Sequence, residues 1–173
     1  MNWEKKDDGS EVARLEAIER ALNIQFPVFT KQIKWNDLGV FIQNNCIHGL
    51  GFYSQNMDYI PKELWNFKNL EVLNLVNNGL IEIPEEIGTL SSLRVLYIGG
   101  NKIKLLPRSI KNLKDLIYFY LLEDNLLDVP KEIGDLTNLK ELSIASKETD
   151  SIPDEIIKLK EKGCRIYFNN EEL

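Results

Sequence analysis

Apolar residues recur along the chain with a period of 23 residues. The clearest unit has seven apolar positions, an asparagine and a proline, in the order Leu70, Leu73, Leu75, Asn78, Leu80, Ile83, Pro84, Ile87 and Leu90. Matching units follow at steps of 23 as far as Leu159, and one step back gives a unit that begins at Ile47. A fixed period in this range is the signature of a repeat protein. The sequence therefore predicts five 23-residue repeats over residues 47–162.

Each repeat is predicted to contain a strand followed by a short helical turn. Two apolar residues separated by one residue, such as Leu73 and Leu75, point to the same face of a strand. In the run 84–87, proline suits the first helical position and the two glutamates suit the positive end of the turn. Seven apolar residues cannot bury themselves within one unit, so neighbouring units must stack. Four such strand pairs are expected to be buried on consecutive parallel strands: Leu73 and Leu75, Leu96 and Ile98, Phe119 and Leu121, Leu142 and Ile144.

Residues 1–46 are expected to form an N-terminal segment and cap, because a solenoid exposes its core at both ends unless something covers it. Residues 1–8 are expected to be flexible. A helix should begin near Glu11, with Ser10 or Asp8 as its N-cap and Asp8 spaced from Glu11 as in a capping box. Its apolar stripe consists of Val12, Leu15, Ile18 and Leu22. Residues 39–52 are predicted to form a hairpin around an Asn44–Asn45 turn.

Residues 163–173 are expected to close the other end. The fifth repeat continues as a longer amphipathic helix that ends at Gly163, a residue well suited to stop a helix. Residues 165–168 then supply a capping strand, one residue out of step with the period. The polar residues 169–172 are expected to finish the sheet edge in solvent.

The repeat pattern resembles the L-x-x-L-x-L-x-x-N-x-L signature of the leucine-rich-repeat family over residues 47–168. The I-P-x-x-I-x-x-L tail is similar to that of short intracellular members related to Ras suppressors and to the plant intracellular Ras-group relatives. The resemblance implies an α/β solenoid with a parallel β-sheet on its concave face and short helical turns on its convex face. The N-terminal helix and hairpin would cap it.

The asparagine of the motif departs from the family pattern in three repeats. The family uses this residue to bond the backbone of neighbouring turns, and only Asn78 and Asn101 keep it. Gln55 and Asp124 can still offer an oxygen, whereas Lys147 cannot. Thr149 also replaces an apolar residue in the same unit as Lys147. The fifth repeat is therefore expected to be the loosest on its loop side.

Side chains between the buried strand positions should point to the concave face, where members of the family usually meet their partners. The middle strands place valine, tyrosine and leucine there, and exposed apolar patches with tyrosine commonly mark interaction sites. The alternative is that these side chains only pack against one another across the strands. The candidate protein-binding residues are Tyr53, Val72, Asn74, Val76, Val95, Tyr97, Tyr118, Tyr120, Leu122, Glu141, Arg165 and Tyr167.

Composition and charge exclude several other classes of partner. Apolar residues make up 43% of the chain, charged residues 28%, and the net charge is −6. Such an acidic chain has no basic stripe for nucleic acid and is repelled by anionic membranes. Neither a signal peptide, a membrane-spanning apolar run nor an Asn-x-Ser/Thr sequon occurs, so a cytoplasmic protein is expected. Cys46 and Cys164 fall five strand spacings of about 4.8 Å apart, too far for a disulfide within one chain.

The sequence contains no enzyme signature of the common nucleotide-binding, hydrolase or metalloprotease kinds. Gly49-Leu50-Gly51 begins like a dinucleotide loop, but Ser54 stands where the third glycine is needed. His48 shares a strand face with Cys46, yet no group that orients the imidazole can be recognised, and a surface histidine explains it better. One histidine and two distant cysteines cannot complete a zinc shell. We therefore expect no catalytic residue, no metal and no cofactor.

Three functional hypotheses follow. The leading one is a monomeric, non-enzymatic interaction module whose concave face binds a protein or peptide, with a small GTPase or signalling partner as one candidate. The second is a structural repeat domain that self-associates through the same patch. The third, an enzyme hidden in residues 1–46, ranks far behind because that segment holds one cysteine and no histidine.

Overall fold

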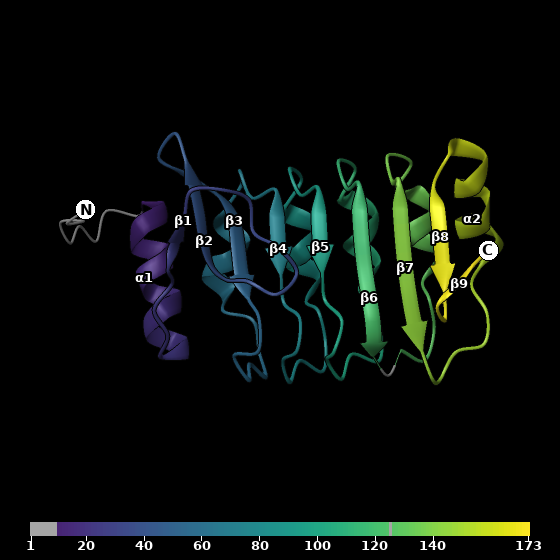
Figure 1. Ribbon diagram of the computed structural model, residues 1–173, viewed down its shortest axis with the longest axis horizontal. Coiled ribbons are helices and arrows are strands. Elements are labelled where there is room, and N and C mark those ends of the chain that lie inside the picture. Colours follow the sequence, from purple (N-terminus) through teal and green to yellow (C-terminus); the bar gives the residue numbers. More distant parts are fainter. Residues whose placement is uncertain (1–9, 125) are drawn as a thin grey trace.

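The chain folds into one nine-stranded sheet whose strands follow one another in sequence order, as the computed structural model shows (Figure 1). The structure describes residues 10–124 and 126–173, with residues 123 and 124 described by their backbone alone. The expected flexible start and the capping role of Asp8 lie outside the described residues. The strands are β1 (Val28–Phe29), β2 (Leu38–Gln43), β3 (Cys46–Phe52), β4 (Val72–Asn74), β5 (Val95–Tyr97), β6 (Tyr118–Asp124), β7 (Glu141–Ser146), β8 (Arg165–Phe168) and β9 (Glu171–Glu172).

The predicted register is confirmed across the parallel strands β3 to β8. Val72 on β4 pairs with Val95 on β5, which pairs with Tyr118 on β6, each a step of 23 residues. Between β7 and β8 the paired residues are 24 positions apart in the chain, since Glu141 pairs with Arg165. The out-of-step last strand is therefore also confirmed. Helical segments cover one of the two faces of the sheet, so the fold is the expected α/β solenoid (Figure 1).

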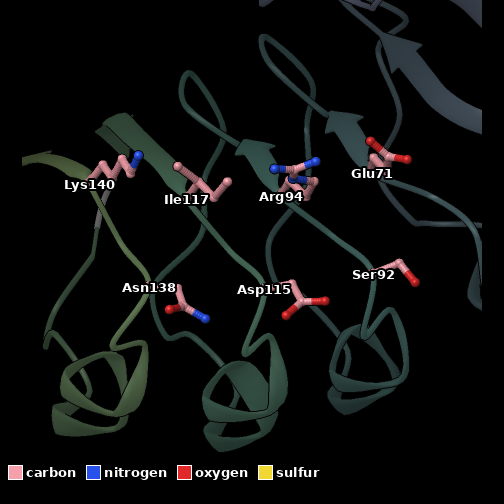
Figure 2. Close-up of a pocket in the computed structure, with 7 residues that line it drawn as sticks. All are labelled: Glu71, Ser92, Arg94, Asp115, Ile117, Asn138 and Lys140. Atoms are coloured by element: carbon pink, nitrogen blue, oxygen red, sulfur yellow. The ribbon is translucent and has the colours of Figure 1, made fainter.

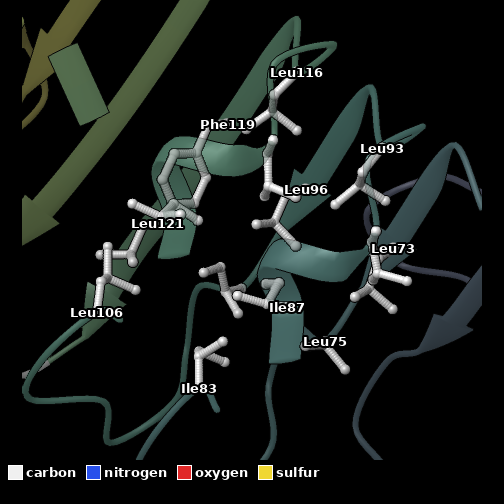
Figure 3. Close-up of a cluster of buried hydrophobic side chains, with 14 of the residues drawn as sticks. Leu73, Leu75, Ile83, Ile87, Leu93, Leu96, Leu106, Leu116, Phe119 and Leu121 are labelled. Carbon is white, nitrogen blue, oxygen red and sulfur yellow. The ribbon is translucent and has the colours of Figure 1, made fainter. Parts of the chain in front are cut away.

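The core lies between the sheet and the helical segments and runs the length of the solenoid (Figure 3). All eight strand residues that were predicted to be buried are at most 1% exposed. The apolar residues before the strand and after the proline are buried as well, as Leu70 and Ile87 are in the second repeat. Burying a leucine or isoleucine side chain contributes about 1.5–3 kcal/mol. Each stacked repeat adds further buried side chains, so the total contribution grows with the number of repeats.

The helical turns are tighter than expected. They are 3-10 helices that follow the prolines, and each proline carbonyl accepts the N–H three residues on, as Pro84 does from Ile87 at 3.1 Å. Proline stands just before the first helical residue rather than at it. These helices are η1 (Lys62–Asn66), η2 (Glu85–Thr89), η3 (Arg108–Asn112) and η4 (Lys131–Asp135).

The longer helix of the fifth repeat is also divided between two helix types. It consists of α2 (Asp154–Ile157) and η5 (Lys158–Lys162), and it ends as predicted at Gly163, which has φ +84°. An α turn rises about 1.5 Å per residue, against about 2.0 Å in a 3-10 helix. The extra residue of this repeat falls in the segment that holds this helix, between Pro153 and Arg165.

Asn78 and Asn101 join neighbouring turns as the family pattern implies. The Asn78 oxygen accepts from the N–H groups of Gln55 and Met57, and its amide donates to the carbonyls of Phe52 and Leu75. Asn101 repeats this arrangement one turn along. In the fifth repeat Ser146 supplies part of the missing bonding, since its hydroxyl donates to the Leu126 carbonyl at 2.8 Å. The expected contribution of Asp124 falls on a side chain outside the described part.

The N-terminal cap combines α1 (Glu11–Leu22) with the β2–β3 hairpin (Figure 1). Ser10 is the N-cap, accepting from the Ala13 N–H, and Ile18 is fully buried. Asn44 and Asn45 form the predicted turn with φ of 51° and 61°. Strand β1, parallel to β2, was not predicted. The α1 helix therefore covers the open N-terminal end of the core.

Candidate protein-binding surface

Three tyrosine rings stand parallel on the concave face, the face of the sheet turned away from the helical segments. Tyr97 and Tyr120 are paired on neighbouring strands, so their rings stack with centroids 5.1 Å apart and planes 10° apart. Tyr118 lies two residues before Tyr120 on the same face, and these rings are 6.4 Å apart with planes 6° apart. The repeat register thus builds a row of aromatic rings in the middle of the sheet.

Glu141 on β7 connects this tyrosine row on β5 and β6 to strand β8. Its carboxylate accepts a 2.9 Å hydrogen bond from the Tyr120 hydroxyl and forms an ion pair with Arg165. Burial of the ring raises the pKa of Tyr120 well above its usual value, and the hydrogen bond and negative charge of Glu141 raise it further. Burial also raises the pKa of Tyr97, with a smaller effect from Glu141. Tyr97 and Tyr120 therefore keep their hydroxyl protons to higher pH than an ordinary tyrosine does.

A segment that the sequence did not predict crosses the concave face at its N-terminal end. Residues 30–37, which we call the strap, join β1 to β2 and pass in front of β3 towards β4 (Figure 1). The Asn74 amide donates to the strap carbonyls of Lys34 and Asp37, at 3.0 and 3.1 Å. Ile33, which is 4% exposed, packs where Gly49 and Gly51 leave room. The strap is thus anchored on the sheet at several points.

The expectation that Val72 and Asn74 are exposed on the concave face is wrong. Val72 is 2% exposed and Asn74 is fully buried, because the strap covers the end of the sheet on which they stand. The signal in the sequence was the pair Gly49 and Gly51. These glycines occupy concave positions where all later repeats carry a side chain, and side chains there would collide with Ile33 and the strap backbone.

The strap and the tyrosine row enclose an open groove of about 540 Å³. Trp35, 55% exposed, forms the strap side of the groove and packs edge-on against Tyr53 with centroids 6.0 Å apart. Gly99 puts no side chain between Val76 and Leu122, which deepens the floor at that point. The residues that line the groove are Trp35, Val76, Asn77, Tyr97, Gly99, Gly100, Tyr120 and Leu122.

The structure therefore brings together four of the predicted binding residues: Val76, Tyr97, Tyr120 and Leu122. Val95 and Tyr118 are half-buried beside the groove, and Tyr53 lies behind Trp35, bonded through its hydroxyl to Asn77. The other three predicted residues lie outside the groove on β7 and β8: Glu141, Arg165 and Tyr167. Sequence reasoning missed Trp35 because nothing in the repeat pattern places it on the sheet.

A second hollow of about 500 Å³ lies where the chain enters the repeat strands (Figure 2). Figure 2 shows its side chains in two rows that follow the repeats. They are mostly polar and of mixed charge: Glu71, Ser92, Arg94, Asp115, Ile117, Asn138 and Lys140. The Ser92 hydroxyl donates to the backbone carbonyl of Lys68 at 2.8 Å.

His48 has an orienting partner, contrary to expectation. Its Nδ1 lies 2.8 Å from a carboxylate oxygen of Glu71, the residue one repeat further along. Among the side chains that the structure describes, no three of His, Cys, Asp or Glu gather closely enough to hold a metal ion. Among the described residues, no helix combines the length and the apolar character needed to cross a bilayer.

Comparisons with solved structures agree with this architecture. The LRR ectodomain of the receptor kinase SOBIR1 from Arabidopsis thaliana superposes with a TM-score of 0.69 over 97% of this chain and 96% of that chain, at 21% identity. An LRR protein of Leptospira interrogans has 30% identity and a TM-score of 0.64, covering 68% of this chain but only 30% of its own.

A third structure was solved with a bound partner. It is the LRR ectodomain of the Arabidopsis thaliana membrane receptor kinase GASSHO1/SCHENGEN3 in complex with CASPARIAN STRIP INTEGRITY FACTOR 2. It shares 26% identity at a TM-score of 0.55, covering 79% of this chain and 15% of that chain. Among curated proteins, none matches the chain. Residues 36–168 match the family described as leucine-rich repeat region, and with that match over most of its length the chain belongs to the leucine-rich repeat family.

Proposed function

We propose that this protein is a non-enzymatic interaction module that binds a segment of another protein in the groove between Trp35 and the tyrosine row. The observation that carries the proposal is the groove itself, an apolar hollow walled by tryptophan and two tyrosines on the concave face. Large rigid aromatic side chains dominate the energetics of protein interfaces, and apolar hollows bordered by polar groups are typical binding sites.

Two further observations support the proposal. The GASSHO1/SCHENGEN3 ectodomain was solved with a bound factor, and the resemblance to it covers 79% of the chain described in this article. In addition, the tyrosine hydroxyls and the indole N–H lie at the edges of apolar rings, where they can both pack against a partner and bond to it. We propose a cytoplasmic monomer. The likeness of the repeat tail to the Ras-suppressor group makes a small GTPase one candidate partner.

The test is capture of partners from a lysate of the native host by the wild type and by Tyr97→Ala with Tyr120→Ala. Neither ring points into the core, so the double variant should keep its far-ultraviolet circular dichroism and lose the captured protein. Truncating an interface tyrosine typically costs about 2 kcal/mol or more. The matched control is Leu105→Ala with Leu127→Ala, two side chains that are 60% and 53% exposed and do not line the groove.

Unchanged capture by a folded double tyrosine variant would refute the assignment of the groove. Unfolding of that variant would instead show that the tyrosines act by packing across the strands. Light scattering separates the proposal from self-association through the same patch. A concentration-dependent dimer that the tyrosine substitutions abolish would favour self-association.

A further inference from the structure

Five of the eight residues that line the groove have a backbone carbonyl that already accepts a hydrogen bond within the sheet. The carbonyls of Val76 and Tyr97 accept from Ser54 and Leu75. The remaining carbonyls on the floor and wall are engaged in the same way: Gly99 by Asn77, Tyr120 by Ile98, and Leu122 by Gly100. On these five residues a ligand therefore meets carbonyls that are already bonded to the protein backbone.

The side chains of the groove offer donors instead. Within the described residues, neither the hydroxyl of Tyr97 nor the indole N–H of Trp35 donates to a protein acceptor. The Tyr120 hydroxyl is committed to Glu141, whose carboxylate also holds Arg165. The Asn77 amide donates to the Tyr53 hydroxyl. The groove is thus lined by aromatic faces with donors at their edges.

The groove also carries no charge. Every one of the described residues that line it is apolar, aromatic, glycine or asparagine. The ligand segment that enters it should therefore be uncharged and apolar, with hydrogen-bond acceptors that match the free donors of Tyr97 and Trp35.

We propose that the groove binds a proline-containing segment of the partner in the polyproline II conformation. Proline has no backbone N–H, and a polyproline II helix makes no internal hydrogen bonds, so its carbonyls are free to accept. Proline rings pack on aromatic faces, and the preformed helix loses little entropy on binding. This inference rests on the proposed function and names the chemistry of the partner.

The strap is the element that decides this specificity. Without it, Tyr97 and Val76 would lie on an open sheet with one aromatic wall. The bonds from Asn74 to Lys34 and Asp37 hold the strap on either side of Trp35. The contact of Trp35 with Tyr53 fixes the indole edge-on to that ring. Asn74 is thus a positioning residue that acts on the ligand through Trp35.

The test uses the full chain and a fluorescein-labelled peptide of ten prolines, followed by fluorescence anisotropy. Saturable binding by the wild type is expected. Trp35→Ala and Tyr97→Ala should each weaken it at least about tenfold, in line with the loss of an aromatic anchor. Tyr97→Phe keeps the ring and removes only the hydroxyl, so it should weaken binding by a smaller, several-fold factor. Leu105→Ala should leave the affinity unchanged. The indole of Trp35 is largely exposed, so its removal does not empty the core.

Several outcomes would overturn the inference: no saturable binding of the proline peptide, equal binding of a Gly-Ser decapeptide, or binding that Trp35→Ala leaves unchanged. Displacement of the peptide by cellohexaose at lower concentration than by unlabelled peptide would assign the groove to a carbohydrate instead. A competition assay separates the two proposals. If the captured host protein depends on Tyr97 and Tyr120 but is not displaced by the proline peptide, the proposed function stands and this inference fails.

Discussion

The hydroxyl of Tyr120 on β6 donates a 2.9 Å hydrogen bond to the carboxylate of Glu141 on β7. The ring of Tyr120 also stacks between those of Tyr97 and Tyr118. Burial of the ring and, after it, the bond to Glu141 raise the pKa of the Tyr120 phenol. Both effects favour the neutral phenol in the folded protein. The protonation of Tyr120 in the tyrosine row therefore affects the stability of the sheet.

The first prediction concerns stability at alkaline pH. An unfolded tyrosine loses its proton near pH 10, whereas folded Tyr120 keeps it. The stabilisation from Tyr120 is therefore complete below about pH 10 and is lost as pH rises towards the folded pKa. Urea unfolding between pH 9 and 11 should show the free energy of unfolding falling more steeply in the wild type than in Tyr120→Phe. The exposed Tyr59→Phe serves as control, and equal slopes in all three proteins would contradict the prediction.

The second prediction concerns the anchor of the strap. Asn74 is fully buried and makes three hydrogen bonds, two to the strap and one from the Val76 N–H to its oxygen. Asn74→Ala removes all three bonds and leaves the Val76 N–H without a partner, whereas the carbonyls of Lys34 and Asp37 still accept from Asp37 and Tyr53. It should lower the free energy of unfolding by about 1–3 kcal/mol, the cost of one unsatisfied buried group. Limited tryptic digestion should also cut faster after Lys31 and Lys34 than in the wild type.

The matched control for the anchor is Asn66→Ala, because Asn66 is an exposed residue of η1 without a left-handed backbone. Its effect on unfolding should be within about 0.5 kcal/mol, as is usual for surface positions. Equal stability and equal cleavage of the strap in both variants would show that the strap is held by Ile33 alone.

The third prediction concerns the fifth repeat. Lys147 cannot accept the backbone N–H groups that Asn78 and Asn101 engage in earlier repeats. The asparagines accept N–H groups of the preceding loop, 21 residues earlier, from Met57 and Leu80. The amide of Leu126, at the same distance before Lys147, should therefore exchange with deuterium faster than those of Met57 and Leu80, as mass spectrometry of peptic fragments can measure. Ser146→Ala should speed exchange further, since Ser146 bonds Leu126 and Glu148. Equal protection in all three loops would show that Ser146 replaces the asparagine completely.

The fourth prediction concerns the two thiols. Cys164 is 5% exposed, and burial, followed by the charge of Glu141, raises its pKa to about 11. Cys46 is half-buried, so it should react first with Ellman's reagent, because the thiolate is the reactive form. Cys46→Ser should leave a thiol that reacts only on unfolding. Strands β3 and β8 are separated by four others, so oxidation should give no disulfide between Cys46 and Cys164 within a folded monomer.

The repeat architecture and most of the register follow from the amino-acid sequence alone. In a solenoid each repeat contacts only its neighbours, so a position in one unit maps onto the same position in the next. That mapping is enough to place Leu96 and Phe119 in the core and Tyr97 beside Tyr120. The out-of-step capping strand at Arg165 and the turn at Asn44 follow from equally local signals.

Which part of the concave face is open depends on the tertiary structure. The strap carries no periodicity, and its contacts join residues about 40 positions apart in the chain, as between Lys34 and Asn74. Such contacts form only where the assembled sheet offers a surface, here the space above Gly49 and Gly51. Burial of Val72 and the position of Trp35 in the groove therefore depend on long-range packing. A repeat pattern cannot encode that packing, because it records only the relation of each unit to the next.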